Sequence, residues 1–370
     1  MTEVNSMAPD YYKGPLKALF TDDIPLIDVR APVEFEQGAY PNAVNIPILD
    51  NGQRHAVGTC YKERGRDEAM ELGHSLVSGS DKEAKLAKWI KAIEERPGSV
   101  IYCFRGGLRS QITQDWLNKE GLNVPIIEGG YKRLRNYLIE YLEAEVARNS
   151  FLVISGNTGS GKTDVLNRLS AAGNKAIDLE GLANHRGSAF GQYSTPQPSQ
   201  IDFENALSIQ FMKEDAKESS YMLLEDESRS IGSIKIPSVL FEKKKQSDIF
   251  VLRIPLEERV ALILRDYVVA MWQNFKDLEN PCERFFDYYK GPFDRIEKRL
   301  GGLIYKECLV DLKNAVDLFE REGSFEGHRA WIEKLLIHYY DPLYEKGLAR
   351  KQEFIVGEGS EADLVAFLNS

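Results

Sequence analysis

The sequence predicts two α/β domains with parallel sheets, the second of which continues into a largely helical C-terminal part. Its 370 residues are enough for two domains of ordinary size. In both halves, short apolar runs alternate with segments whose apolar residues recur at helical spacing, and this alternation is typical of parallel sheets. A glycine-rich loop starts the second alternation in mid-chain. We therefore expect one domain over residues 1–137, a linker helix over 138–149 and a second domain over 150–370.

The first half contains four strand candidates, each an apolar run that ends at a polar or glycine turn: residues 24–29, 43–48, 99–103 and 124–128. Two segments between them, residues 81–94 and 110–119, show the apolar spacing of helices. Residues 131–149 are charged and amphipathic, which predicts the helix that connects the domains. This half is therefore predicted to be a small parallel sheet covered by helices.

The second half starts with the apolar run 151–154. It contains three more candidates for buried strands, at residues 175–179, 221–224 and 248–254. From about residue 256 to residue 344 the pattern becomes mostly helical. The second domain is therefore predicted to place its sheet first and its helices last.

Net charge, cysteine spacing and the lengths of the apolar runs exclude several classes of protein. The net charge of −10 excludes a generally basic surface for nucleic acid, so any RNA contact must come from a local patch. The four cysteines show no C-x-x-C spacing, so neither a disulfide framework nor a zinc site is predicted. No run approaches the ~18 apolar residues of a membrane span, and the N-terminus has neither a basic nor an apolar signal region. We expect a soluble, cytoplasmic protein without membrane contact.

Residues 156–163 read G-N-T-G-S-G-K-T at a junction between a strand and a helix. The glycines let backbone N–H groups turn toward phosphate oxygens, and the following helix directs its positive dipole end at the same anion. Lys162 is expected to neutralise the terminal phosphate, and the Thr163 hydroxyl to hold Mg²⁺. The whole loop is predicted to bind a phosphate or diphosphate: Gly156, Asn157, Thr158, Gly159, Ser160, Gly161, Lys162 and Thr163. The second domain is therefore predicted to be P-loop NTPase-like, with Mg²⁺ but no tightly bound cofactor.

An acidic string follows the strand candidate 221–224, where such domains place the acid that orients Mg²⁺. Asp226 is the expected partner of the ion. Glu225 remains an alternative, because the usual acid ends the strand directly. A solvated acidic turn that includes Glu227 is the structural alternative.

Cys103 follows the strand 99–102 and opens the loop CFRGGLRS, with a helix predicted from about Ser110. A cysteine at a strand end that faces a helix N-terminus favours the thiolate. Arg105 and Arg109 add positive charge and donors for an oxyanion, and Gly106 and Gly107 permit a tight backbone turn. Cys103, Arg105 and Arg109 are therefore the predicted catalytic set, with a buried inert cysteine as the alternative.

The segments LIDVRAPVEFEQGAYPNAVNIP and CFRGGLRS resemble a rhodanese domain. That family carries a transferable sulfur on the loop cysteine as a persulfide. Five residues separate Cys103 from Arg109, one more than in many sulfur-carrying rhodaneses, and this length also resembles the related cell-cycle dual-specificity phosphatases. A wider ring accepts selenium or a phosphate group, so loop length leaves the chemistry open.

A rhodanese-like domain followed by a phosphate-loop domain resembles, over essentially the full length, the tRNA 2-selenouridine synthase family. Four further strings support the resemblance: VGTCYKERGRDEAMELGH, IIEGGYKRLR, LEGLANHRGSAFG and LEDESRSIG. The resemblance implies a transferase that converts wobble 2-thiouridine (U34) of tRNA to 2-selenouridine. Geranyl diphosphate would first alkylate the sulfur, and selenophosphate would then supply selenium through Cys103. The implied partners are the tRNA anticodon stem-loop and an enzyme that supplies selenophosphate.

Two basic clusters are candidates for tRNA binding. Residues 283–306 combine basic side chains, of which Arg284, Arg295 and Arg299 are the candidates, with interleaved aromatic residues that would stack on unpaired bases. The alternative is that aromatics at this helical spacing form core. The second cluster, beside the cysteine domain, contains Lys132, Arg133 and Arg135.

Three other features have two interpretations each. Cys60 is either a second thiol near the site or a packing residue. Asp28 and Arg30, at the end of a strand, are interpreted as a structural salt bridge rather than site residues. His185 and Arg186 either bind an acceptor, as in small-molecule kinases of this fold, or belong to a surface loop.

Two rival functions remain. The first is an NTP-dependent sulfurtransferase that acts on a small molecule or a carrier protein, and it predicts that a deletion strain keeps 2-selenouridine in its tRNA. The second is a phosphate-loop switch whose first domain is an inert binding module. Cys103, Arg105 and Arg109 speak against the second, because an inert module needs no thiolate.

Overall fold

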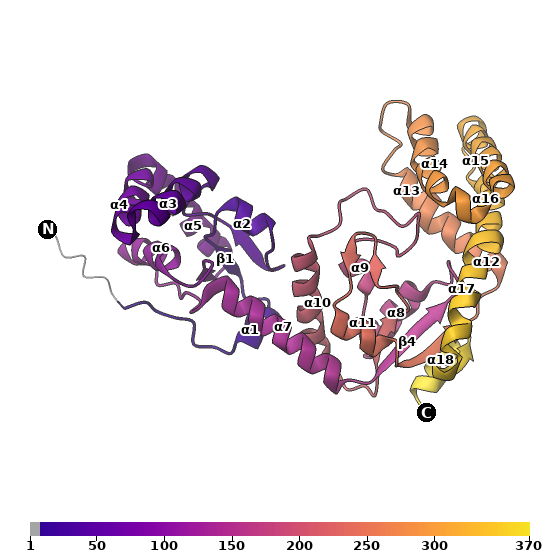
Figure 1. Cartoon of the computed structure of the whole chain (residues 1–370), viewed down its shortest axis with the longest axis horizontal. Helices are drawn as coiled ribbons and strands as arrows, with labels where there is room; N and C mark the ends of the chain where they lie inside the picture. The colour runs from indigo at the N-terminus through magenta and orange to yellow at the C-terminus, as the bar shows by residue number, and fades with distance from the viewer. Residues whose placement is uncertain (1–7) are drawn as a thin grey trace. The chain divides into compact units, whose positions relative to one another are not determined.

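The computed structural model describes residues 8–370 and divides into two compact units (Figure 1). Unit 1 is formed by the chain up to residue 145 together with residues 199–216, and unit 2 by residues 146–198 and 217–370. Residues 1–7, part of the N-terminus in which no signal region is predicted, lie outside the described residues. Within residues 8–370, no helix is both long and apolar enough to cross a membrane.

Unit 1 is built on a three-stranded parallel sheet in the order β2-β1-β3. These strands, β1 (Leu26–Asp28), β2 (Ala43–Asn45) and β3 (Val100–Tyr102), lie within three of the four predicted runs. The fourth run, residues 124–128, forms no strand: only Ile126 pairs, through isolated bridges to Tyr11 and Ile101. The helices are α1 (Leu16–Thr21), α2 (Pro32–Glu36), α3 (Asn51–Arg64), α4 (Arg66–Leu76), α5 (Gly79–Glu95), α6 (Leu108–Lys119) and α7 (Gly130–Arg148).

Helix α10 (Gln200–Glu214) lies between strands of unit 2 in the sequence, yet it packs on unit 1. Asn205 Nδ2 donates to the carbonyl of Ala39 at 2.7 Å, and the N–H of Ala39 donates to Asp202 at 2.7 Å. The apolar side chains of Ile209 and Met212 join a buried cluster of the rhodanese-like half. The sequence-based boundaries assign residues 199–216 to the second domain, whereas the structure places them in unit 1.

Unit 2 contains a five-stranded parallel sheet in the order β10-β9-β4-β6-β5. Its strands are β4 (Phe151–Gly156), β5 (Lys175–Ile177), β6 (Met222–Glu225), β9 (Asp248–Leu252) and β10 (Ile355–Gly359). Sequence patterning does not predict β10, because a strand with three polar or glycine residues in five has no apolar run. A short antiparallel pair, β7 (Ser230–Ile231) and β8 (Ile234–Lys235), stands apart from this sheet.

Helices surround the sheet of unit 2 and continue into the helical part that the sequence predicts (Figure 1). Helices α8 (Lys162–Ala171), α9 (Leu179–Leu182) and α18 (Glu361–Leu368) contact its strands, and α11 (Ser238–Lys244) precedes β9 in the chain. The helical part contains α12 (Leu256–Ile263), η1 (Leu264–Val269), α13 (Ala270–Trp272), α14 (Pro281–Leu300), α15 (Gly302–Glu322), η2 (Glu326–His328), α16 (Arg329–Leu335), η3 (Leu336–Tyr340), α17 (Asp341–Leu348) and η4 (Ala349–Phe354). The predicted fold class, two α/β parts with a helical C-terminal part, is confirmed.

Candidate functional site

Cys103 directly follows β3, and its thiol faces the first turn of α6. Its Sγ is 3.3 Å from the hydroxyl of Ser110, which in turn donates to the carbonyl of Gly107 at 3.0 Å. The first N–H groups of a helix have no partner inside the helix and carry its positive dipole end. Cys103 is only 3% exposed, so the thiol is held in a polar niche at the helix N-terminus.

The backbone of the cysteine loop is fixed from outside by the start of α7. The N–H of Tyr131 donates to the carbonyl of Cys103 at 2.8 Å, and that of Lys132 to the carbonyl of Phe104 at 3.0 Å. Two glycines with positive φ make this approach possible, Gly106 (φ 64°) and Gly130 (φ 56°). A Cβ on Gly106 would lie 2.4 Å from the carbonyl oxygen of Ile127, so no other residue fits there without a shift of the backbone.

Arg109 is held by an acid that sequence reasoning missed. Its guanidinium donates to both carboxylate oxygens of Glu34, at 2.6 and 3.1 Å, and Arg54 lies 3.3 Å from the same carboxylate. Burial raises the pKa of Glu34, but the hydrogen bonds and charge of Arg109 outweigh it, so that this pKa lies below its usual value. Nothing in the local sequence around Glu34 indicates this pairing, because the two residues are 75 positions apart.

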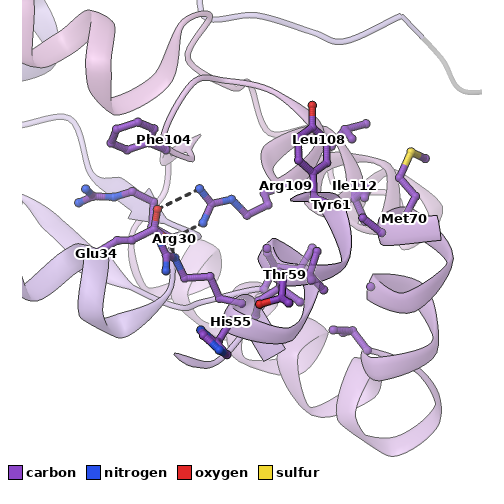
Figure 2. Close-up of a pocket in the computed structure, with 18 of the residues that line it drawn as sticks. Arg30, Glu34, His55, Thr59, Tyr61, Met70, Phe104, Leu108, Arg109 and Ile112 are labelled. Atoms are coloured by element: carbon purple, nitrogen blue, oxygen red, sulfur yellow. Dashed lines mark hydrogen bonds and ion pairs between the residues drawn. The ribbon is translucent and has the colours of Figure 1, made fainter. Parts of the chain in front are cut away.

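The predicted catalytic arginines lie in different hollows. Arg105 is exposed and lines an open hollow of about 670 Å³ together with Lys132 and Arg133. Arg109 lines a second cavity, of about 860 Å³, on the side of the loop that carries Phe104 and Leu108 (Figure 2). The cysteine loop therefore separates a basic hollow from a larger cavity.

The three basic residues of α7 have different surroundings. Lys132 and Arg133 lie at the basic hollow, where Arg133 also pairs with Glu128 at 2.7 Å. Arg135 instead pairs with Glu204 and donates to Asn205 Oδ1 at 2.9 Å, both on α10. The guanidinium of Arg135 is thus engaged with α10, and its contact with tRNA stays a prediction.

Asp28 and Arg30 form the structural salt bridge that the sequence analysis favours. Their side chains are 2.6 Å apart and at most 2% exposed. The Arg30 guanidinium also lies 3.9 Å from the ring centroid of Tyr131. Burial raises the pKa of Asp28 even though Arg30 acts in the opposite direction, as expected for an ion pair withdrawn from water.

The phosphate loop of unit 2 joins β4 to α8 and has the expected left-handed glycines, Gly159 (φ 81°) and Gly161 (φ 69°). Lys162 Nζ donates across the loop to the carbonyl of Gly156 at 2.9 Å. A Cβ on Gly159 would lie 2.7 Å from the side chain of Ile263, so this glycine also permits a close approach of α12. The strand, loop and helix of the motif thus form the cradle that the sequence predicts.

An ion pair that the sequence does not reveal supports this loop from α12 and α17. Arg259 is 5% exposed, and its guanidinium donates to both oxygens of Asp341 at 2.8 and 2.7 Å. It also donates to the carbonyl of Thr158 at 3.2 Å, while Asn157 Nδ2 donates to Asp341 at 2.8 Å. Asn157 and Thr158 are therefore held by the helical part of unit 2.

Glu225, rather than Asp226, contacts the Thr163 hydroxyl. Glu225 is the last residue of β6, and it accepts a hydrogen bond from the Thr163 hydroxyl, which also contacts Glu180 at 3.1 Å. Asp226 instead accepts from Ser155 at 2.7 Å and pairs with Lys351 at 2.7 Å. Glu225, the alternative kept in the sequence analysis, is thus the acid that meets Thr163, while Asp226 lines the phosphate-loop cavity and stays a prediction as an Mg²⁺ partner.

The electrostatics around Thr163 suit a divalent cation. Burial and the neighbouring carboxylates Glu225 and Glu227 raise the pKa of Glu180, and burial and Asp178 raise that of Glu225. Asp226 behaves in the opposite way: burial raises its pKa, but Lys244 and Lys351 bring the value below normal. A hydroxyl beside two carboxylates that repel each other is a donor set that fits Mg²⁺, which prefers oxygen ligands.

A cavity of about 740 Å³ extends from the phosphate loop between α9 and the helical part. Arg186 lines it and lies between the rings of Tyr193 and Tyr267, 4.6 and 4.7 Å from their centroids. One of its guanidinium nitrogens, Nη1, is buried and finds no hydrogen-bond partner among the described residues. Arg186 is therefore placed to meet an anion in this cavity, whereas its neighbour His185 does not line it.

Three of the five aromatic residues of α14 are core residues, and Phe286 and Tyr288 are half-buried against the same cluster. Phe285, Tyr289 and Phe293 are at most 1% exposed and belong to the main cluster of the helical part. The expectation of base stacking by these residues is therefore wrong, because their helical spacing reflects packing. Of the predicted basic residues, Arg299 lines the phosphate-loop cavity, Arg295 donates to the carbonyl of Ala189 at 3.2 Å, and Arg284 to that of Glu279 at 2.8 Å.

All four cysteines are free, as expected. Cys60 is half-buried on α3 and lines none of the cavities described above, although its neighbours Thr59 and Tyr61 do. The structure therefore gives no second thiol at the surface of either candidate site.

Comparison with known proteins identifies the family. A family model described as the tRNA 2-selenouridine synthase AAA domain matches residues 149–370, and one for a rhodanese-like domain matches residues 10–137. A protein of Marinobacter nauticus named tRNA 2-selenouridine synthase is 46% identical over 93% of this chain and 94% of its own. Proteins of the same name from Shewanella denitrificans and Nitrosomonas europaea are 44% and 42% identical, over 95% and 98% of this chain and 96% and 99% of theirs. The chain therefore belongs to the tRNA 2-selenouridine synthase family.

Proposed function

We propose that this protein is a cytoplasmic transferase that converts 2-thiouridine at the wobble position of tRNA to 2-selenouridine in two steps. Unit 2 geranylates the sulfur with geranyl diphosphate, and unit 1 exchanges the geranylated sulfur for selenium from selenophosphate. The observation that carries the proposal is that the thiol and the phosphate cradle belong to different units, each with a cavity of its own. The names of the relatives support tRNA selenation as the outcome.

The first step transfers a geranyl group. The sulfur of the base attacks C1 of the donor, the C–O bond breaks, diphosphate leaves, and the base loses its N3 proton. The phosphate loop holds the diphosphate, where Lys162 and Arg186 offset the charge that develops on the leaving oxygen. The tyrosines and Leu343 along the cavity contact the prenyl chain. Thr163, Glu225 and Glu180 would hold Mg²⁺, which supplies further charge neutralisation.

The second step replaces sulfur by selenium at C2 of the base. Selenium in selenophosphate is already at the selenide level, so its transfer to Cys103 as a sulfur–selenium bond would require a two-electron oxidant. A route without redox change starts when the Cys103 thiolate attacks C2 and geranylthiolate leaves and takes a proton. Selenophosphate then attacks C2 through selenium, the C2–Cys103 bond breaks, and water cleaves the Se–P bond to give phosphate and 2-selenouridine.

Basic side chains beside the cysteine loop bind the RNA in this proposal. Arg105, Lys132 and Arg133 at the basic hollow contact phosphates of the anticodon stem-loop, and Arg299 does so at unit 2. The target base lies in an anticodon loop, where it is already unpaired, so no helix has to open. An enzyme that produces selenophosphate is the expected supplier of the second substrate.

The proposal is tested by omitting nucleoside triphosphates. Geranyl diphosphate contains its own leaving group, so neither step requires ATP or GTP. Thiolated tRNA incubated with Mg²⁺, geranyl diphosphate and selenophosphate alone should be converted fully to 2-selenouridine, as measured by mass spectrometry of nucleosides. An absolute requirement for a hydrolysable triphosphate, unmet by its non-hydrolysable analogue, would contradict the proposal.

A further inference from the structure

The largest cavity described in unit 1 is apolar inside and lies beside the cysteine loop (Figure 2). Its volume is about 860 Å³, within the range of pockets that enclose small organic molecules. Side chains from three helices line its interior, among them Val57 on α3, Ala69 and Met70 on α4, and Leu108 and Ile112 on α6. None of the residues assigned to the first step lines it.

The helices that form the outer wall of this cavity lack an ordinary core. Helix α3 has no buried residue although it is 14 residues long, and Ala69 is the only buried residue of α4. Apolar side chains at the cavity remain accessible: Tyr61 is 60% exposed, and Phe104 and Leu108 are each 37% exposed. A helix pair normally buries an apolar stripe, so this wall has apolar surface that a ligand would cover.

The charges around the cavity indicate that its apolar ligand is attached to an anionic molecule. Five of the lining residues are arginine or lysine: Arg30, Arg54, Lys62, Arg66 and Arg109. Glu34 is the only acid that lines it, and Arg54 and Arg109 already pair with this carboxylate, while Arg30 pairs with the buried Asp28. Lys62 and Arg66 form no ion pair among the described residues, so they leave positive charge at the cavity although the chain's net charge is −10. This positive charge suits phosphates of a nucleic acid whose apolar substituent enters the cavity.

The cavity touches the cysteine loop through residues that follow Cys103. Phe104 directly follows Cys103, and Leu108 and Arg109 form the first turn of α6, above which Ser110 contacts the thiol. A substituent in the cavity would therefore keep its point of attachment at the loop.

We propose that this cavity binds the hydrocarbon chain of the S-geranylated base and thereby positions C2 of that base for Cys103. This assignment rests on the proposed function and adds the site that distinguishes the geranylated intermediate from its thiolated precursor. When the Cys103 thiolate attacks, the bond between C2 and the geranyl sulfur breaks, the leaving geranylthiolate takes a proton from water, and its chain remains in the cavity until release. The geranyl group thus has two roles: its attachment makes the sulfur a leaving group, and its binding in the cavity identifies the substrate.

The test compares two anticodon stem-loops, one with S-geranyl-2-thiouridine and one with S-methyl-2-thiouridine. Both give a thiolate leaving group, so a preference for the first measures recognition of the chain. The full-length protein should bind the geranylated RNA roughly a hundredfold more tightly, because each buried methylene adds to the transfer free energy. Ala69→Trp, which fills the cavity from α4, should reduce this ratio about tenfold or more.

Glu71→Trp is the matched control, since it adds the same side chain at an exposed position of α4 that does not line the cavity. If Ala69→Trp fails to fold, Val57→Phe fills the same cavity from α3. An unchanged geranyl-to-methyl ratio in a folded cavity variant overturns the assignment. The assignment is also overturned if a cavity variant loses geranylation and keeps selenation, because this result would place free geranyl diphosphate in the cavity. Failure of the wild-type protein to selenate geranylated RNA at all would instead refute the proposed function.

Discussion

The cysteine loop of unit 1 and the phosphate loop of unit 2 have the same local design and opposite electrostatics. Each follows a strand of a parallel sheet, turns through glycines with positive φ and ends at a helix N-terminus. In the cavity beside the cysteine loop, five arginines and lysines face one lining acid, Glu34, and the buried Asp28. Around Lys162, the carboxylates Glu180, Glu225 and Glu227 gather, and the pKa values of Glu180 and Glu225 are raised.

This difference teaches that the strand–loop–helix geometry supplies only N–H groups and a dipole, while neighbouring elements decide what is bound. In unit 1 the neighbours favour a polyanion next to a nucleophile. In unit 2 they favour a cation together with the phosphates. The predictions below test whether the two loops serve separate steps.

The largest effect is expected from Cys103→Ser. Selenation should be lost, since a serine hydroxyl is a far weaker nucleophile at neutral pH, while geranylation in unit 2 continues. Thiolated tRNA supplied with both donors should accumulate the geranylated base, which mass spectrometry detects. A folded variant that makes neither product, or that still makes 2-selenouridine, would show that the steps are not divided in this way.

Lys162→Ala should affect the other step. The lysine offers a charge-assisted contact to phosphate, typically worth about 1.5–3 kcal/mol, so geranylation should fall roughly ten- to hundredfold. Selenation of tRNA that was geranylated beforehand should persist. Equal loss of both steps in a variant with an unchanged melting curve would point to one shared site.

A pair of adjacent glycines tests how rigid the cysteine loop must be. Gly106→Ala forces a side chain into a left-handed conformation and against the backbone of Ile127, whereas a Cβ on Gly107 meets no atom within 4 Å. The first change should lower selenation about tenfold or more and destabilise the protein by roughly 1–2 kcal/mol or more, while Gly107→Ala should have little effect. Equal behaviour of the two variants would mean that the contact with α7 does not matter.

The smallest effect concerns pH. Burial and the nearby carboxylates raise the pKa of Glu180 to about 9 in the folded protein. A carboxyl with a raised folded pKa contributes stability that is complete below its unfolded pKa and is lost as pH rises through the folded pKa. Glu180→Gln removes that loss, so its melting temperature relative to the wild type should rise by a few °C between pH 5 and pH 9, as differential scanning calorimetry would show. A difference that is constant with pH would contradict the assigned repulsion.

Local patterns predict the parts of this structure that depend on neighbours in sequence. Apolar spacing and glycine positions predict the two loops, the positions of most parallel strands in the sequence and the helical C-terminal part. The same spacing misleads at α14, where buried aromatic residues resemble a stacking surface.

The remaining features depend on residues brought together from distant parts of the chain. Glu34 meets Arg109, and Asp341 meets Arg259, across 75 and 82 positions. The apolar cavity depends on the packing of three helices, so no single segment indicates it. Glu225 ends β6 and contacts Thr163, whereas the next residue, Asp226, contacts Ser155, and a strand boundary predicted from sequence is uncertain by more than one residue.

The most direct test of separate steps is a mixture of the Cys103→Ser and Lys162→Ala proteins with thiolated tRNA, geranyl diphosphate, selenophosphate and Mg²⁺. Each protein lacks the step that the other retains. If the two loops act independently through a released geranylated tRNA, the mixture should produce 2-selenouridine at a rate well above the sum of the two proteins alone. If the geranylated base accumulates and no 2-selenouridine forms above that sum, the two steps do not belong to separable sites, and the account is wrong.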